Sequence, residues 1–364
     1  MSQLQIGFIG LGLIGGSIAK AIKENIDQVS IVAYDINKDS IQAAVKDHIV
    51  DIPSDSIDSV FSGCDYLFLC APVQKNDENL LKIKSLIKPG CLLTDVGSVK
   101  TGIHEAITAA GLEESFIGGH PMAGSERTGY TNSKSILLQN AFYILTPSEK
   151  VATEKVEHYR QLVEKMGAIP LIIDYKQHDH VTAAISHLPH VIAASLVNLV
   201  KDSDSKDGIM KMIAAGGFKD ITRIASSSPT MWQQICLTNT GNISTLLQSY
   251  IDSLIGIKKE LDQKDAEYLY QFFDSARIYR DSFASSSSGP IKCTYSFKLD
   301  IDDRPGGLAE VVTVLANASI NIKNIGITHN REDTFGVLYL EFYDEEALIH
   351  AKKILSEQHY SIQD

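Results

Sequence analysis

The sequence predicts a parallel, doubly wound α/β sheet, then an all-helical domain, then a small β-α-β-β-α-β module. Three observations predict this order. Short apolar strands alternate with amphipathic helices over residues 1–173, helical periodicity alone continues over 174–283, and strand signals return after residue 290. Residues 284–290 are Ala-Ser-Ser-Ser-Ser-Gly-Pro, a composition typical of a flexible linker. We therefore expect four segments: 1–173, 174–283, 284–290 and 291–364.

The first strand, Leu4–Ile9, is followed by glycines with the spacing of a dinucleotide-binding turn. Gly10 would allow a tight turn, Gly12 would let the backbone approach a diphosphate, and Gly15 would let the helix pack closely on the strand. The diphosphate would lie at the N-terminus of the helix, where Leu13 and Ile14 stand. Glycine also serves strand-to-helix turns for purely steric reasons, so the context decides.

The second apolar strand, Val29–Tyr34, ends in Asp35, 20 residues after Gly15. An acidic side chain there can hold the ribose hydroxyls of an adenosine. Because no arginine follows in residues 36–38 to receive a 2′-phosphate, NAD is the expected cofactor rather than NADP. The sequence therefore predicts a Rossmann-like, NAD-binding first domain.

Further strands are expected at residues 66–72, 92–96, 116–119, 141–145 and 169–173. In a doubly wound sheet, ligands bind beyond the carboxyl ends of the strands, so the residues at these ends are the candidates for function. Ala71 and Pro72 would shape the wall around the nicotinamide ribose, although a proline can simply end a strand.

Two further strand ends carry groups that suit catalysis. Ser98 brings a hydroxyl to this edge, or it caps a helix that begins near Thr101. His120 lies in a Gly-His-Pro loop, and imidazole is the side chain best suited to take a proton near neutral pH. A lone histidine is more often structural, but the strand-end position and the neighbouring glycines favour catalysis.

The helical domain is rich in histidine and carries a cationic pair. No metal site is expected there, because the spacing from His187 to His190 crosses a proline and no cysteine is near. Lys219 and Arg223 are four residues apart, which places both on one helix face. Such a face suits a dianionic substrate, or it is a solvated face paired with Asp220. A long helical segment is expected from about residue 244 to 283.

Composition excludes several classes of protein. Lys and Arg total 33 against 45 Asp and Glu, a formal charge of −12, and no long basic run suggests nucleic-acid binding. The five cysteines are scattered without a C-x-x-C pair, so reduced thiols are expected. The N-terminus lacks the basic region of a signal peptide, and no other stretch is judged long and apolar enough to span a bilayer. We therefore expect a cytoplasmic protein.

The tail is expected to be ferredoxin-like, with strands at 292–301, 321–330 and 334–343, helices at 307–318 and 345–357, and a short last strand. Its first turn, with Pro305 and Gly306, has free backbone N–H groups at a helix N-terminus that can receive a carboxylate. Facing residues from Asn321 and Ile322 would complete an amino-acid site. The alternative is a tail that only dimerises, since proline and glycine suit any tight turn.

Five motifs together resemble the prephenate dehydrogenase family, the oxidoreductases of tyrosine biosynthesis, over essentially the whole chain. They are Gly-Leu-Gly-Leu-Ile-Gly-Gly-Ser (10–17), Asp-Val-Gly-Ser-Val-Lys (95–100), Gly-His-Pro-Met-Ala-Gly-Ser-Glu (119–126), Ser-His-Leu-Pro-His (186–190) and Gly-Gly-Phe-Lys-Asp-Ile-Thr-Arg (216–223). The tail resembles an ACT domain, a small amino-acid-sensing module, through Asp-Arg-Pro-Gly-Gly-Leu (303–308).

The resemblance implies an enzyme that oxidises and decarboxylates prephenate with NAD. His120 would bind the ring hydroxyl, Ser98 would position both His120 and the nicotinamide, and Arg223 would grip a carboxylate. The remaining implied pocket residues are Ser125, His187, His190, Lys219 and Trp232, with Glu126 and Asp220 forming an ionic gate with Arg223. The resemblance also implies a homodimer with tyrosine as an effector bound at the tail.

Three rival functions remain. An arogenate dehydrogenase would act on a substrate that bears an ammonium group where prephenate has a keto group. A β-hydroxyacid dehydrogenase shares the glycine-rich start and a helical second domain, but it relies on a lysine rather than on a strand-end His-Pro loop. A non-catalytic, NAD-sensing regulator with an amino-acid-binding tail is the third.

Overall fold

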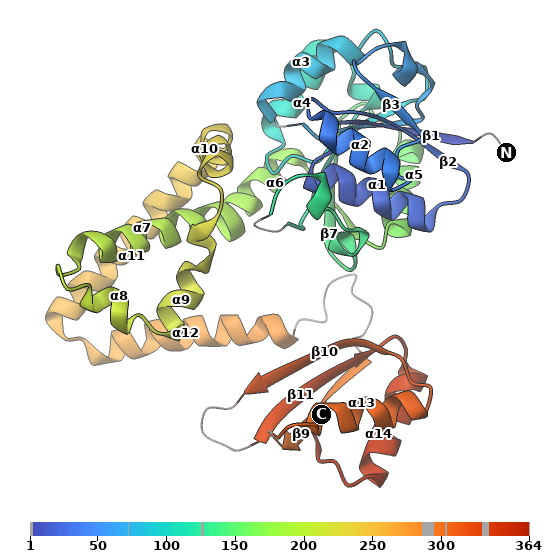
Figure 1. Ribbon diagram of the computed structural model, residues 1–364. Coiled ribbons are helices and arrows are strands. Elements are labelled where there is room, and N and C mark those ends of the chain that lie inside the picture. Colours follow the sequence, from blue (N-terminus) through green and yellow to red (C-terminus); the bar gives the residue numbers. More distant parts are fainter. Residues whose placement is uncertain are drawn as a thin grey trace. The chain divides into compact units, whose positions relative to one another are not determined.

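The computed structural model describes residues 3–71, 73–124, 127–285, 295–302, 304–329 and 335–363 (Figure 1). The chain divides into two compact units, Met1–Lys259 and Glu260–Asp364, and each is taken by itself. Several positions selected from the sequence lie outside the described residues. They are Pro72, Ser125, Glu126 and Asp303, together with all but the first two residues of the expected linker at 284–290.

The first unit begins with a five-stranded parallel sheet in the order β3-β2-β1-β4-β5. This order confirms the predicted doubly wound, Rossmann-like sheet. The strand β3 was missed, because Ile-Pro-Ser offers no apolar run. The strands are β1 (Leu4–Ile9), β2 (Val29–Tyr34), β3 (Ile52–Ser54), β4 (Tyr66–Leu69) and β5 (Leu92–Asp95).

Helices cover both faces of this sheet (Figure 1). Because successive strand residues point to opposite faces, β1 contributes Ile6 and Phe8 to one core and Ile9 to the other. Phe8 also stacks on Phe68 of β4, with ring centroids 5.0 Å apart. One face packs α1 (Leu13–Asn25), α2 (Lys38–Lys46) and α5 (Thr153–Lys165), and the other packs α3 (Val73–Ile83) and α4 (Thr101–Ala110).

The later strands form a separate three-stranded sheet, β6-β7-β8, made of Ile117–Pro121, Phe142–Pro147 and Ile169–Ile172. Strands β6 and β7 run antiparallel, so the prediction of a parallel sheet over all of residues 1–173 was wrong here. The described part of their connection holds only the short 3₁₀ turns η3 (Tyr130–Asn132) and η4 (Ser135–Leu138), whereas parallel neighbours need a longer crossover, usually a helix. A parallel bridge between Leu93 and Phe116 links the two sheets.

The rest of the first unit is helical, as predicted. Pro189, in the first turn of α7, has no N–H to donate to residue 185. A π-helical turn, η5 (Ala183–His187), connects α6 to α7 at this point. The helices are α6 (Tyr175–Thr182), α7 (Leu188–Ser203), α8 (Ile209–Ile213), α9 (Gly216–Thr222), the 3₁₀ turn η6 (Arg223–Ser226), α10 (Pro229–Thr238) and α11 (Thr240–Gln263).

The continuous helical stretch Tyr175–Ser203 has the length and apolar composition of a membrane-spanning helix. The expectation that no such stretch exists was therefore wrong by this test. The finding is weak evidence for a membrane, because a single helix can pass this test by its length and composition alone. Two polar residues of the stretch, His178 and Asp179, are fully buried, and Asp179 accepts hydrogen bonds from α4.

The second unit contains α12 (Ala266–Ser285) and a four-stranded antiparallel sheet in the order β10-β11-β9-β12. The single helix expected from 244 to 283 is interrupted between α11 and α12, where Lys264 has a left-handed φ of 56°. The tail follows a β-α-β-β-α-β order. Its elements are β9 (Tyr295–Asp302), α13 (Gly307–Asn317), β10 (Ile322–His329), β11 (Phe335–Phe342), α14 (Glu345–Glu357) and β12 (Ile362–Gln363).

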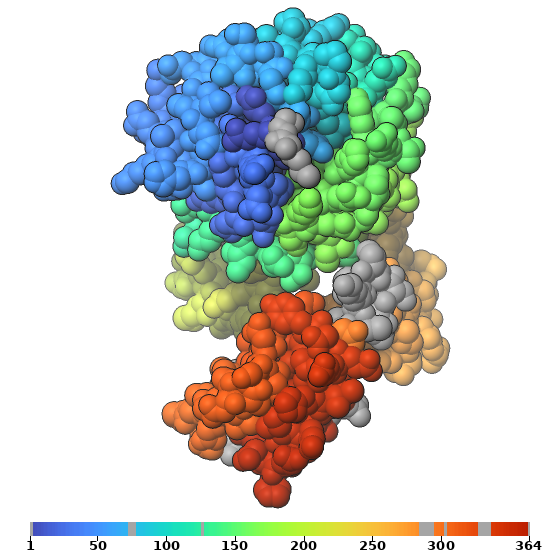
Figure 2. Space-filling model, turned by 90° about the vertical axis from the view of Figure 1, so that its right-hand side faces the viewer, coloured from blue at the N-terminus to red at the C-terminus, as the bar shows by residue number. Residues whose placement is uncertain are grey.

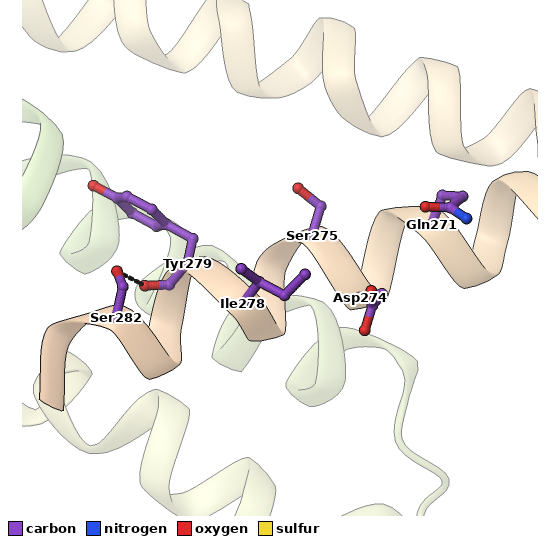
Figure 3. A pocket seen from close by; sticks show the side chains of 6 residues that line it. All are labelled: Gln271, Asp274, Ser275, Ile278, Tyr279 and Ser282. Carbon is purple, nitrogen blue, oxygen red and sulfur yellow. Dashed lines mark hydrogen bonds between the residues drawn. The ribbon is translucent and has the colours of Figure 1, made fainter. Parts of the chain in front are cut away.

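A groove of about 400 Å³ runs along α12 (Figure 3). Its lining comes from this one helix, and Ser282 Oγ donates a hydrogen bond of 2.6 Å to the carbonyl oxygen of Tyr279 there. The lining residues are Gln271, Asp274, Ser275, Ile278, Tyr279 and Ser282. None of them was selected from the sequence, and the candidate site is built from other residues.

Candidate active site

The turn between β1 and α1 has a shape that requires glycine. Gly10 has a φ of +94°, and a Cβ there would lie 2.7 Å from the backbone nitrogen of Ala71. A Cβ on Gly15 would lie 2.8 Å from the carbonyl oxygen of Gly10. At Gly12, the N-cap of α1, a Cβ would meet nothing within 4 Å, and the first turn of the helix has no acidic residue. The turn thus offers open space at the positive end of a helix dipole, which fits a dinucleotide diphosphate.

Asp35 lies half-buried beside this turn, at the end of β2. Its carboxylate accepts hydrogen bonds from the backbone N–H of Leu11, at 2.5 Å, and of Asn37, at 2.7 Å. These two bonds hold the carboxylate at the edge of the glycine turn, the position that the sequence predicts for contact with a ribose. The surface view in Figure 2 shows the blue N-terminal residues bordering green residues from the middle of the chain.

His120 is part of strand β6, paired with Ile144 of β7, rather than in a loop after the strand. Its Nδ1 lies 2.8 Å from Nε2 of His178, and the two rings meet edge to face at 5.0 Å. Burial, reinforced by the electrostatic influence of the neighbouring His178 and Lys100, lowers the pKa of His120 well below its ordinary value. His120 is therefore neutral near pH 7, which is the form that can accept a proton.

Two residues outside the predicted site complete a chain with His120. His178 Nδ1 lies 2.8 Å from Oδ1 of Asp179. Asp179 also accepts bonds from the backbone N–H of Lys100 and Thr101, each at 2.8 Å, and from Thr101 Oγ1 at 2.6 Å. Burial alone would raise the pKa of Asp179, but the bonds from His178, Thr101 and Lys100 outweigh it and lower the pKa. The adjacency of His178 and Asp179 in the sequence was the available signal, but no catalytic role was predicted for either residue.

A buried ion pair fixes the strand that carries His120. Lys100 Nζ contacts Oδ2 of Asp95 and donates to the carbonyl oxygen of Gly119 at 2.7 Å. Asp95 Oδ1 accepts from the N–H of Gly119 at 3.2 Å, and Oδ2 accepts from Gly97 at 2.9 Å. The pair thus joins β6 to the loop between β5 and α4, which includes the half-buried Ser98.

A second cluster gathers around Trp232 on α10. His190 stacks on the indole with ring centroids 3.6 Å apart, and His187 meets it edge-on at 6.0 Å. Burial lowers the pKa of His187 to about 4, so this ring is also neutral near pH 7. Among the described residues, the indole Nε1–H is buried without a hydrogen-bond partner, which marks it as a donor for a ligand.

Asn239, which was not selected from the sequence, connects the two clusters. Its amide nitrogen lies 2.8 Å from the carbonyl oxygen of Asp179 and 3.2 Å from Nδ1 of His187. Because an amide N–H can only donate, Nδ1 of His187 accepts, and the proton of the neutral ring is on Nε2. Asn239 thus fixes the tautomer of His187.

The cationic pair departs from its predicted arrangement. Helix α9 ends at Thr222, and Arg223 begins the 3₁₀ turn η6, so Lys219 and Arg223 do not share one continuous α-helix face. The turn η6, which begins at Arg223, packs against α7, which carries His190. Burial lowers the pKa of His190, the bond to the carbonyl oxygen of Ser186 raises it, and the charge of Arg223 lowers it. Lys219 and Asp220 are exposed. The gate expected between Arg223, Asp220 and Glu126 involves a position outside the described residues.

Neither the cysteines nor the metal-ligating side chains form a second functional site in the described part of the chain. No group of three His, Cys, Asp or Glu there is arranged to hold a metal ion. The four described cysteines are free thiols, and burial raises the pKa of Cys64 and of Cys91 to about 12. Such thiols are poor nucleophiles near neutral pH.

Comparison with known proteins gives consistent matches. Residues 18–171 match the family described as "Prephenate dehydrogenase, nucleotide-binding domain", and residues 174–275 match "Prephenate dehydrogenase, dimerization domain". The chain is 39% identical to a prephenate dehydrogenase of Bacillus subtilis over 353 residues, which cover 95% of this chain and 94% of that protein.

Two solved structures are also similar. A prephenate dehydrogenase from A. aeolicus, in complex with hydroxyphenyl propionate and NAD⁺, superposes with a TM-score of 0.73 at 31% identity and covers 78% of this chain and 99% of its own. An arogenate dehydrogenase from Synechocystis gives a TM-score of 0.70 at 28% identity and covers 77% of this chain and 100% of its own.

Proposed function

Because the chain belongs to the prephenate dehydrogenase family and is an NAD-dependent oxidoreductase, we propose that it converts prephenate and NAD⁺ to 4-hydroxyphenylpyruvate, CO₂ and NADH. The observation that carries this proposal is the neutral, half-buried imidazole of His120, which is hydrogen-bonded to His178. It lies on β6, and a parallel bridge directly before this strand connects it to the sheet that carries the glycine turn. A base in this state can take the proton of a ring hydroxyl.

In the proposed reaction His120 accepts the proton of the C4 hydroxyl while C4 releases a hydride. NAD⁺, when bound, supplies the hydride acceptor. The bond between C1 and its carboxylate then breaks and CO₂ leaves. The electron pair of that bond enters the ring, and the C4 oxygen takes back the proton from His120 and becomes a phenol. Aromatisation makes the step irreversible. The residues of the chain orient the ring, neutralise two carboxylates and exclude water.

We propose specific residues of this chain as contacts of the substrate and the nicotinamide. Ser98 would position His120 and the nicotinamide, and Arg223 would bind a carboxylate. The buried Nε1–H of Trp232 and the packing of η6, which begins at Arg223, against α7 support a polar pocket at this cluster. The other proposed pocket residues are Ser125, His187, His190 and Lys219, and Glu126 and Asp220 would form the gate.

Replacing Arg223 by alanine should raise KM for prephenate about 10- to 100-fold with little change in kcat. The charge-assisted contact that is lost is made in both the ground state and the transition state, and such contacts contribute about 1.5–3 kcal/mol. Lys219→Ala should raise KM less. Steady-state kinetics check this, with Arg160→Ala on α5 as the control that should leave KM unchanged. If KM for Arg223→Ala equals the wild-type value, Arg223 does not bind substrate.

The cofactor preference should respond to Asp35. The double change Asp35→Ser and Asn37→Arg should shift the ratio of kcat/KM values toward NADP by about tenfold or more, equivalent to about 1.4 kcal/mol. The reason is that the carboxylate repels the 2′-phosphate of NADP and the new arginine attracts it. Asp39→Ser, on the exposed first turn of α2, is the matched control. An unchanged ratio in the double variant would show that Asp35 does not face the ribose.

We also propose that the protein is a cytoplasmic homodimer that binds neither membrane nor nucleic acid. The helical part leaves many large apolar side chains exposed in a single chain, and such surface is typical of an interface. A second copy would cover them, along with the apolar face of Tyr175–Ser203. They include Leu199, Ile209, Met212, Ile213, Ile221, Leu237, Leu254 and Ile255.

For the tail we propose a ferredoxin-like ACT module that binds tyrosine. Gly306, with a φ of +93°, is the N-cap of α13 and makes no side-chain cap bond. The turn that follows Pro305, beginning with the N–H of Gly306, would present backbone N–H groups to a carboxylate, and Asn321 and Ile322 would complete the site. The proposed domains are 1–173 for NAD, 174–283 for substrate and dimerisation, the linker 284–290, and 291–364 for regulation.

Removing the tail should abolish regulation and leave catalysis. A chain that ends after Phe283 should keep its kcat and lose inhibition by tyrosine, because the effector site would be gone. The two similar solved structures cover 77–78% of this chain, which supports independent folding of the shorter chain. Initial rates with and without tyrosine check this. Equal inhibition of both chains, competitive with prephenate, would assign tyrosine binding to the active site.

The proposed activity is tested by mixing the protein with NAD⁺ and prephenate and following the absorbance of NADH. Steady formation of NADH is expected. Its absence, in protein that binds NAD⁺, would instead favour a non-catalytic regulator.

A further inference from the structure

We propose that His178 and Asp179 are positioning residues that hold the proton of His120 on Nδ1 and so leave the lone pair of Nε2 free to act as the base. The inference rests on the proposed role of His120. It assigns two residues to the reaction that do not themselves touch the substrate. The His120–His178–Asp179 chain is formed by two hydrogen bonds, each 2.8 Å long.

The direction of these bonds follows from Asp179. Its carboxylate, buried but surrounded by donors, receives three further bonds from Lys100 and Thr101 at the N-terminus of α4. A carboxylate with this set of donors is ionised and can only accept. Nδ1 of His178 must therefore carry the proton in its bond to Asp179.

The same logic passes through His178 to His120. In the uncharged ring of His178, a proton on Nδ1 leaves Nε2 with only a lone pair. The bond to His120 then requires that Nδ1 of His120 donates. In a neutral ring this places the lone pair of His120 on Nε2, the nitrogen that is not bound to His178.

Asp179 is held in place through both its side chain and its backbone. The side chain of Asp179 is tied to α4, and its carbonyl oxygen accepts from the buried amide of Asn239 at 2.8 Å. When Nε2 of His120 takes a proton, the negative charge of Asp179 stabilises the imidazolium through His178. A Ser-His-Asp triad uses the same principle, with one ring fewer between base and carboxylate.

Two substitutions of His178 separate positioning from packing. His178→Leu removes the acceptor for Nδ1–H of His120, so kcat should fall about 10²-fold with KM for prephenate within about threefold of wild type. His178→Gln can still accept through its amide oxygen and should keep kcat within about tenfold. His180→Leu, two residues away and exposed on the same helix, should match wild type. Equal kcat values for the Leu, Gln and wild-type proteins would overturn the proposal.

A measurement on the unmodified protein decides the matter even if His178→Leu does not fold. In ¹⁵N-histidine-labelled enzyme, with the His120 signals assigned from the His120→Asn spectrum, Nδ1 should be protonated and Nε2 bare. A proton on Nε2 of His120 at neutral pH would overturn the proposal. The tautomer is read without any substrate, so this outcome is distinct from a failure of the proposed activity, which would appear as a lack of NADH formation with prephenate.

Discussion

The His120→Asn protein should bind NAD⁺ with wild-type affinity and turn over prephenate about 10²- to 10⁴-fold more slowly, the range that a general base contributes. Asparagine keeps a nitrogen donor near the position of Nδ1 and so can retain the bond to Nε2 of His178. It lacks the second ring nitrogen that would take the proton. The loss should therefore appear in kcat and not in cofactor binding.

The matched control for this change is His180→Asn. His180 lies on α6 close to His178 in sequence, but it is exposed. Its substitution should leave kcat unchanged. Calorimetric titration with NAD⁺ and steady-state rates measure both effects, and a His120→Asn protein that kept more than a tenth of wild-type kcat would exclude His120 as the base.

The Lys100→Met protein should lose about 3–5 kcal/mol of unfolding free energy, because the change leaves the carboxylate of Asp95 buried without its cationic partner. Both side chains of this pair are almost completely buried, and Lys100 also binds the carbonyl oxygen of Gly119 next to His120. Urea unfolding followed by circular dichroism measures the loss. The double variant Asp95→Asn with Lys100→Met should recover part of it, since the unpaired charge is then removed.

Lys38→Met is the control for the ion pair. Lys38 forms an ion pair with Asp55 at 3.3 Å, but both side chains are largely exposed to solvent. Screening makes such pairs weak, so the urea midpoint should not change. If Lys100→Met lowered the midpoint no more than Lys38→Met, the buried pair would not hold the strand of His120.

The parts of the fold that were predicted correctly depend on local sequence. An apolar run followed by Gly10, Gly12 and Gly15 specifies strand, turn and helix within a few residues. The place of Asp35 beside that turn was predicted from its spacing along the sequence. The antiparallel pairing of β6 and β7 was not predicted, because strand direction depends on the path of the connection and not on the strands themselves. The interruption at Lys264 was missed because no glycine or proline marks it.

The candidate site was predicted only in part, for a related reason. His120 was selected from its place beside Gly119 and Pro121, but its partner His178 is 58 residues away and is brought to it by the packing of α6. Asn239 joins that network from 60 residues beyond Asp179. Pairings of this kind arise from tertiary structure, and no spacing rule in one sequence reports them.

The central claim is that this site oxidises prephenate, and comparison of prephenate with arogenate as substrates tests it most directly. With NAD⁺ as acceptor, kcat/KM for prephenate should exceed that for arogenate by about tenfold or more, equivalent to about 1.4 kcal/mol. NADH, CO₂ and 4-hydroxyphenylpyruvate should form in equal amounts. A higher kcat/KM for arogenate, with tyrosine as the product, would contradict the account.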